Sequence, residues 1–363
     1  MTATPTAELP AVQRQRVLDP PLVVEQLVLQ TSFLGDAVLT TPLITELAMR
    51  GPVDVLTTPA AAPVLKNNPH IRTLHIYDKR GEDSGATGLH RVAQRLRDAM
   101  RSRKASRSIA YIAQGSLRTA ALAALAGYDE RVGFADAPGR LFYTMRVIRR
   151  DDRHHAERLW RLAFPSNPNV EPPEGALRPR LYPGAAEQSA VDGVLGAWAH
   201  EAIIALAPGS VWGTKRWPYY SMLASRLSRR HKLVVVGGPD DAELAAGILA
   251  AAEPGMALDA TGKLSLLGSS ELLARARLLI TNDSSPQHLA SAMNTPTIAV
   301  FGPTVPAFGF GPLAPHSLIA ELPDLACRPC HHHGPPTCPL THWKCMRDLS
   351  VDRVEEMVNQ IIN

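Results

Sequence analysis

The sequence predicts an α/β protein made of two Rossmann-like domains that face each other across an interdomain cleft. Apolar, β-branched segments alternate with segments of helical periodicity within residues 22–170 and again within residues 184–346. Repeated βα units form parallel, doubly wound sheets. Between the two series the chain is rich in proline, so we expect it to cross from one domain to the other there.

The first series opens with a strand over residues 22–29, a polar loop, and a helix over residues 37–49 in which apolar residues recur at helical spacing. Because a strand, a loop and a helix follow one another, this unit sets the pattern for the rest of the domain. Further strands are expected at residues 53–56, 71–77 and 108–113, and further helices at residues 60–66, 89–104 and 117–126.

Prolines recur from residue 165 to residue 183, and we place the domain linker at residues 171–183. Residues 347–363 close the chain with an amphipathic helix over residues 351–362. In the second domain we expect strands at residues 202–207, 232–236, 258–260, 278–281 and 297–301, and helices at residues 219–230, 241–252, 266–276 and 286–293.

Composition excludes several classes of protein. With 363 residues, 45% of them hydrophobic, the chain can bury two cores and is not disordered. No apolar run is long enough to cross a bilayer, and residues 1–21 carry charges where a signal peptide has its apolar core. We therefore expect a cytoplasmic protein with a flexible extension at residues 1–21.

The net charge of +4 is concentrated as positive charge in the first half of the chain. Seven basic residues follow one predicted helix and its exit, a pattern typical of a surface that approaches an anionic partner or a membrane. A solvated face without a partner fits this run equally well. The residues are Arg91, Arg95, Arg97, Arg101, Arg103, Lys104 and Arg107.

Ligands of α/β proteins bind at loops that follow strands. The loop at residues 31–37 contains Gly35, which permits close approach of a ligand, and Asp36, whose carboxylate projects into the expected cleft. An aspartate here also caps the following helix, and composition alone favours that structural role.

The loop at residues 207–218 leaves the first strand of the second domain. Ser210, Thr214, backbone N–H groups and Lys215 could converge there on a diphosphate, with the lysine as a point charge. A loop lysine is otherwise only solvated, and the Gly/Ser/Thr frame makes the two interpretations comparable.

The loop at residues 281–288 again joins a strand to a helix. Asp283 or Ser284 caps this helix, and the free amides of its first turn suit an anion or sugar hydroxyls. His288 falls in the first turn, where a lone histidine is more often packed than catalytic. The loop at residues 301–304 is expected beside it.

Two other patterns were weighed. Residues 309–314 fit the dinucleotide pattern G-x-G-x-x-A, but Pro312 and Pro315 prevent the helix that such a site needs, so we reject nicotinamide binding there. The four cysteines gather in one segment with four histidines, which leaves open a zinc site, reduced thiols or a disulfide. The cysteines are Cys327, Cys330, Cys338 and Cys345.

These loops together resemble those of the ADP-heptose:lipopolysaccharide heptosyltransferases of glycosyltransferase family 9, most closely the heptosyltransferase II branch. The resemblance covers nearly all of residues 22–363. It rests on residues 30–42 (QTSFLGDAVLTTP), residues 208–210 (PGS), residues 215–218 (KRWP), residues 281–290 (TNDSSPQHLA), residues 301–304 (FGPT) and residues 342–346 (HWKCM).

The resemblance implies a GT-B fold in which the first domain holds the acceptor, the second holds the nucleotide-sugar, and the last helix packs back on the first domain. It implies inverting transfer with no cofactor and no essential metal. Asp36 matches the proposed catalytic base, Lys215 the diphosphate-binding lysine, and Asp283 the carboxylate that contacts the donor sugar. The matched donor residues further include Ser210, Thr214, Ser284, Ser285, His288 and Thr304, with Glu243 as a weaker match to a ribose-binding glutamate, while Ser32 and Gly35 are expected at the acceptor.

The function expected from the sequence is therefore transfer of a heptose from ADP-heptose to the phosphorylated lipid A core, by an enzyme peripheral to the inner face of the cytoplasmic membrane. Nucleic acid is not an expected partner. Near a helix N-terminus the pKa of Asp36 should stay low, so the base would accept its proton late. A sugar-nucleotide 2-epimerase and a non-catalytic sugar-nucleotide-binding protein remain as alternatives.

Overall fold

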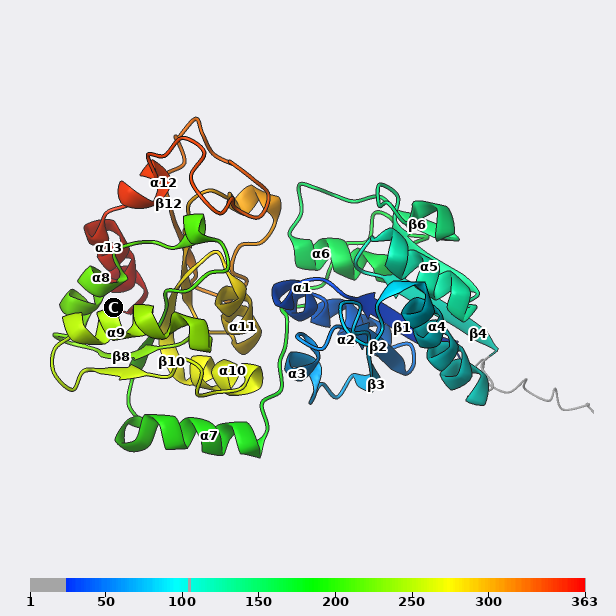
Figure 1. Cartoon of the computed structure of the whole chain (residues 1–363), viewed down its shortest axis with the longest axis horizontal. Coiled ribbons are helices and arrows are strands. Elements are labelled where there is room, and N and C mark those ends of the chain that lie inside the picture. Colours follow the sequence, from blue (N-terminus) through cyan, green and yellow to red (C-terminus); the bar gives the residue numbers. More distant parts are fainter. Residues whose placement is uncertain (1–23, 104–105, 363) are drawn as a thin grey trace, which may run out of the picture.

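The computed structural model describes residues 24–103 and 106–362, which form two domains, each built on a six-stranded parallel sheet (Figure 1). The expected extension at residues 1–21 and Lys104 of the basic run lie outside the described residues. The α/β architecture predicted from the alternating pattern is thereby confirmed.

The first sheet has the strand order β3-β2-β1-β4-β5-β6. The order reverses between β1 and β4, and such a point opens a crevice at the carboxyl ends of the two strands. The strands are β1 (Val24–Gln30), β2 (Val53–Thr57), β3 (Ile71–Ile76), β4 (Arg107–Ile112), β5 (Glu130–Phe134) and β6 (Met145–Val147).

The helix expected over residues 37–49 is in fact two helices. Pro42 has no N–H to donate, and the chain restarts as a second helix around it. Asp36 lies in the first turn of the first helix. The helices of this domain are α1 (Leu34–Leu39), α2 (Thr41–Ala48), α3 (Ala62–Leu65), α4 (Gly85–Ser102), α5 (Leu117–Ala126) and α6 (His155–Trp160), with short 3-10 turns η1 (Arg140–Phe142) and η2 (Arg161–Ala163).

The second sheet repeats this plan with the order β12-β11-β10-β7-β8-β9, and its order reverses between β7 and β10. Its strands are β7 (Ile203–Ala207), β8 (Lys232–Val235), β9 (Ala257–Asp259), β10 (Ala276–Asn282), β11 (Thr297–Phe301) and β12 (Leu318–Glu321). The main helices are α7 (Ala185–Leu195), α8 (Tyr220–Leu227), α9 (Ala242–Ala251), α10 (Leu266–Arg275), α11 (Ser285–Met293), α12 (Lys344–Arg347) and α13 (Val351–Ile362).

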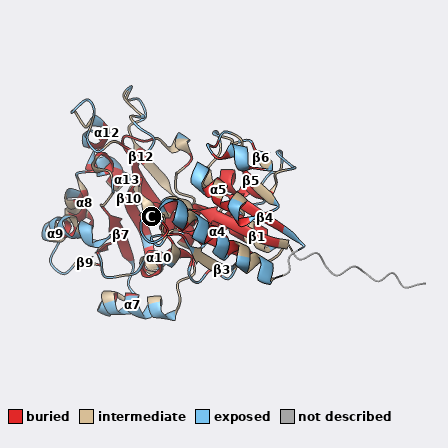
Figure 2. Ribbon diagram, turned by 45° about the vertical axis from the view of Figure 1, so that its right-hand side comes forward, coloured by how far each residue is buried: buried red, intermediate tan, exposed pale blue. Residues whose placement is uncertain are grey.

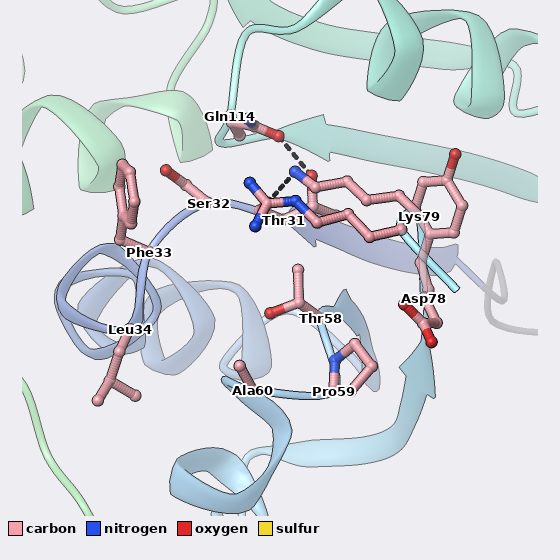
Figure 3. A pocket seen from close by; sticks show the side chains of 12 residues that line it. Thr31, Ser32, Phe33, Leu34, Thr58, Pro59, Ala60, Asp78, Lys79 and Gln114 are labelled. Carbon is pink, nitrogen blue, oxygen red and sulfur yellow. Dashed lines mark hydrogen bonds between the residues drawn. The ribbon is translucent and has the colours of Figure 1, made fainter. Parts of the chain in front are cut away.

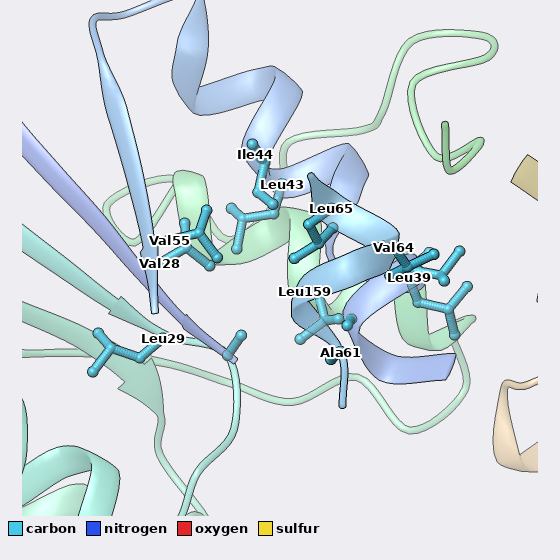
Figure 4. Close-up of a cluster of buried hydrophobic side chains, with 14 of the residues drawn as sticks. Val28, Leu29, Leu39, Leu43, Ile44, Val55, Ala61, Val64, Leu65 and Leu159 are labelled. Atoms are coloured by element: carbon cyan, nitrogen blue, oxygen red, sulfur yellow. The ribbon is translucent and has the colours of Figure 1, made fainter. Parts of the chain in front are cut away.

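Both sheets are buried between layers of helices, as the near-continuous apolar strands predict (Figure 2). In the first domain, Val28 and Val55 on neighbouring strands belong to one buried cluster with Leu43 of α2 and Leu65 of α3 (Figure 4). This packing fixes the carboxyl ends of the strands, and therefore the loops that follow them.

The sequence did not predict β5, β6, β12, α6 or α7. The β5 segment begins with Glu130 and Arg131, and β6 and β12 contain three and four residues, so none carries an apolar run that periodicity would detect. The segment between η2 and α7, which contains the expected linker at residues 171–183, runs through turns and extended backbone.

The last helix corrects an expectation. Its bounds agree with residues 351–362, but α13 packs against α8 and β10 of its own domain and not across the first domain. Val351, Val354 and Val358 join the apolar cluster of the second domain (Figure 1). The apolar stripe therefore predicted a packed helix, and it did not identify the surface against which that helix packs.

The basic run on α4 is mostly engaged within the first domain. Arg95 contacts Asp83 at 3.0 Å, and Arg103 contacts Glu25 at 3.0 Å and also Asp54. Arg91, Arg97 and Arg107 likewise bond to Glu82, to the end of α5 and to Glu130. Most of this run therefore ties α4 to its neighbours. None of the helices in the described ranges combines the length and apolar composition that crossing a bilayer requires.

Candidate active site

Loops from both domains line one interdomain cavity of about 160 Å³. Asp36 of the first domain and Lys215 of the second both line it, so the two residues expected to face each other share a crevice. The cavity lies where the second sheet reverses its order, between the loops that follow β7 and β10. Other lining residues include Gly35, Ser210, Asp283, Ser284, Ser285 and His288.

Asp36 both caps its helix and faces the cavity, so the two roles weighed for it coexist. Its Oδ2 accepts the N–H of Phe33 at 3.3 Å, and its Oδ1 lies 3.4 Å from Nε2 of His155. Burial raises the pKa of Asp36 above its usual range, although Ser32, His288 and Phe33 favour the charged form. The expectation of a low pKa was therefore wrong, because the opposing domain removes water from the carboxylate.

His155 is a site residue that the sequence analysis missed. It begins α6, and burial lowers its pKa to about 3, so the imidazole facing Asp36 is neutral. Its ring stacks on Phe310 of the second domain at 4.8 Å, and its backbone N–H donates to Gly309 O at 2.7 Å. The contact joins residues far apart in the chain, so no local pattern announces it.

Segment 309–314, rejected as a dinucleotide site, therefore docks the two domains together. A Cβ at Gly309 would lie 2.8 Å from Arg153 O, and Gly309 has φ +89°, a conformation that favours glycine. His154 adds a polar contact of 3.0 Å between its Nε2 and Gly311 O. The glycines thus serve close approach between backbones.

Lys215 is buried and its ammonium is fixed by the loop after β10. Its Nζ donates to Oδ2 of Asp283 at 2.6 Å and to the carbonyl oxygen of Asp283 at 3.2 Å. Thr304 donates to the same Oδ2 at 2.6 Å, and Gln287 donates to Oδ1 at 2.9 Å. Asp283 is therefore the residue that orients the lysine toward the cavity.

Three expected donor residues lie outside the cavity lining. The Thr214 hydroxyl donates to Pro335 O, and Thr304 acts on Asp283 as described. Glu243 is exposed on α9, so its contact with a ribose stays a prediction.

His288 forms a tight joint between the domains. A Cβ at Gly35 would lie 2.6 Å from Cδ2 of His288, so only glycine allows α1 to approach α11 this closely. Burial lowers the pKa of His288 to about 4, which makes this imidazole neutral as well. The packed role weighed for His288 is thus present together with its place in the cavity.

The cysteine- and histidine-rich segment covers one side of the cavity. His332 and His333 line it, and His333 meets Phe33 of the first domain edge to face at 5.7 Å. All four cysteines are free thiols, and burial raises the pKa of Cys345 to about 11. Within the described residues no group of three or more metal-ligating side chains is placed to hold a metal ion, so the structure does not support the zinc alternative.

A second and larger cavity of about 550 Å³ opens at the carboxyl edge of the first sheet (Figure 3). Ser32 lines this cavity, whereas Gly35 lines the interdomain one. Phe33 lines both, so the two cavities meet at its ring. The site therefore has two compartments, one of which lies wholly in the first domain.

Paired Rossmann-like domains with a carboxylate on one wall of the cleft and an ordered ammonium on the other are typical of glycosyltransferases of the GT-B class. Comparison with known proteins gives the family: residues 93–342 match glycosyltransferase family 9 (heptosyltransferase), and the chain belongs to this family. The resemblance stated from the loops is thereby confirmed.

Relatives carry the same name. Lipooligosaccharide heptosyltransferase 2 of Campylobacter jejuni is 32% identical over 170 residues, which is 44% of this chain and about half (51%) of that relative. Lipopolysaccharide heptosyltransferase 2 of Escherichia coli K12 is 27% identical over 297 residues, 78% of this chain and 84% of that relative. The solved E. coli ADP-heptose lipopolysaccharide heptosyltransferase II has a TM-score of 0.74 at 23% identity, covering 93% of this chain and 98% of that one, and confirms the GT-B fold.

Proposed function

We propose that the protein transfers a heptose from ADP-heptose to a sugar hydroxyl of the lipopolysaccharide inner core, with inversion at the anomeric carbon. The family supports the donor class. One observation supports the mechanism: Asp36 and Lys215, from different domains, line the same cavity. An inverting transfer needs a base and charge stabilisation of the leaving group, and these two residues supply one each.

In the proposed step the acceptor oxygen forms a bond to the anomeric carbon while the bond from that carbon to the diphosphate breaks. The acceptor proton passes to Asp36, and the bonding electron pair leaves with ADP. The raised pKa of Asp36 makes its carboxylate a stronger base than an exposed aspartate. Lys215, held by Asp283, lies where negative charge develops on the diphosphate.

His155 positions the base in this scheme. Its neutral Nε2 lies 3.4 Å from Asp36 Oδ1, a long contact of the kind that tightens when substrates bind. Because Phe310 and Gly309 hold His155 from the second domain, docking of the domains fixes the orientation of the base. Base alignment and closure are therefore one event.

The test uses Asp36→Asn and Lys215→Ala in the full chain. We expect Asp36→Asn to abolish transfer from ADP-heptose to a lipid A acceptor carrying Kdo, while ADP-heptose still binds with unchanged affinity. Lys215→Ala should weaken ADP and ADP-heptose alike. Near-normal turnover by Asp36→Asn would reject the base, and sugar-product formation from ADP-heptose without acceptor would favour an epimerase.

The acceptor in this proposal is a lipid, so the enzyme would meet it at the inner face of the cytoplasmic membrane as a peripheral protein. Association with anionic lipid vesicles that falls as salt rises would support this part of the proposal.

A further inference from the structure

The larger cavity is built entirely from loops that follow strands of the first sheet. Thr31 follows β1, Thr58 follows β2, Lys79 follows β3 and Gln114 follows β4. The reversal of strand order between β1 and β4 falls here, which is where α/β sheets bind ligands. With about 550 Å³, the cavity has room for one or two sugar rings beside Phe33.

One end of this cavity carries positive charge that the protein does not neutralise. The ammonium of Lys79 donates to Thr31 O at 2.6 Å, which fixes its position and leaves other donor directions open (Figure 3). Arg80 lines the same end, and Arg118 approaches by donating to Lys79 O at 3.3 Å. Burial, and next the charges of Arg80 and Arg118, lower the pKa of Lys79.

The neighbouring carboxylates do not balance these cations. Asp78 accepts the N–H of Gly81 at 2.9 Å, and in Figure 3 its side chain lies away from the group formed by Lys79, Thr31 and Gln114. Asp83 is paired with Arg95 at 3.0 Å. In the described part of the chain Lys79 and Arg80 have no carboxylate partner, so their charges remain available to a ligand.

A second observation also points to a ligand. Tyr77 lines this cavity and is only 1% exposed, yet its hydroxyl has no hydrogen-bond partner among the described residues. A buried hydroxyl without a partner is costly and uncommon in folded proteins. A polar ligand in the cavity would supply the missing partner.

We propose that this cavity binds the acceptor through an anionic group, a carboxylate or a phosphate on a sugar, held by Lys79 and Arg80 with the Tyr77 hydroxyl as a further contact. The assignment rests on the proposed function, because it makes this compartment the one that presents a hydroxyl to Asp36 past Phe33. Anion recognition is thereby placed in the loop after β3. Most of the α4 arginines are engaged elsewhere.

The experiment measures binding of three small probes to the full chain by calorimetry: Kdo for a sugar carboxylate, mannose 6-phosphate for a sugar phosphate, and neutral mannose. We expect at least one charged sugar to bind tenfold or more tightly than mannose, and the stronger of the two identifies the anion. Raising NaCl from about 0.05 M to about 0.5 M should weaken that probe and leave mannose unaffected.

The variants Lys79→Gln and Arg80→Gln should each lose roughly tenfold affinity for the charged probe. Arg101→Gln, an exposed arginine on α4, is the matched control and should bind like the wild type. ADP affinity is measured in every variant, because retained ADP binding shows that the chain is folded.

No preference for either charged sugar in the wild type, or full retention of that preference in Lys79→Gln and Arg80→Gln, would overturn the inference. If the wild type fails to bind ADP or ADP-heptose, the proposed function fails, and the charged-sugar preference still decides the inference separately.

Discussion

Replacing His155 by phenylalanine isolates the contact that holds the candidate base. Phenylalanine keeps the ring that stacks on Phe310 at 4.8 Å and removes only Nε2, which lies 3.4 Å from Asp36 Oδ1. A contact of this length to a carboxylate contributes about 1 kcal/mol. Lost from the transition state, that energy lowers kcat about fivefold.

The same variant should change the pH profile in a defined direction. Asp36 acts as a base only when ionised, so activity falls as pH drops through its pKa, which burial already raises. A polar hydrogen from neutral His155 favours the ionised form, and removing it raises the pKa further. We expect the acid limb of kcat against pH to move upward by about 0.7 pH unit.

The assay is release of ADP during heptosyl transfer, followed across pH at saturating substrates. His154→Phe is the matched control, because His154 Nε2 contacts Gly311 O and His154 is not in contact with Asp36. An acid limb that stays in place in His155→Phe, or that moves equally in His154→Phe, would refute the positioning role.

Two further predictions concern packing. Gly35→Ala places a Cβ 2.6 Å from His288 Cδ2, so the domains should dock less closely; we expect kcat to fall at least tenfold with ADP affinity retained, measured by steady-state kinetics and calorimetry, and unchanged kcat would show that the joint tolerates displacement. Val354→Ala removes two methyl groups from a fully buried side chain of α13 and should lower the free energy of unfolding of the second domain by about 2 kcal/mol in urea, whereas exposed Glu356→Ala should not; equal stability of both variants would contradict the packing of α13.

Much of the fold could be predicted from the sequence, because central strands such as β1 and β7 are apolar throughout and their loops carry glycine, serine and aspartate. Short or polar strands at the sheet edges, such as β5 and β6, lack that signal. The stripe on α13 predicted a buried face and left its partner open.

The site follows the same division. Asp36, Lys215 and Asp283 lie in strand-end loops, and the structure brings all three to one cavity. The contact between His155 and Asp36, and the raised pKa of that carboxylate, arise from pieces of chain that meet only after both domains have folded. Local periodicity carries no information about such meetings.

The docking of residues 309–311 onto His154 and His155 bears on how the enzyme would treat water. When the halves separate, the imidazole beside Asp36 loses its aromatic support and the carboxylate regains hydration, so a solvent molecule reaching the activated sugar meets no aligned proton acceptor. Wasteful hydrolysis of the donor is thereby suppressed in the open state, and the energy stored in ADP-heptose is spent only when both halves engage.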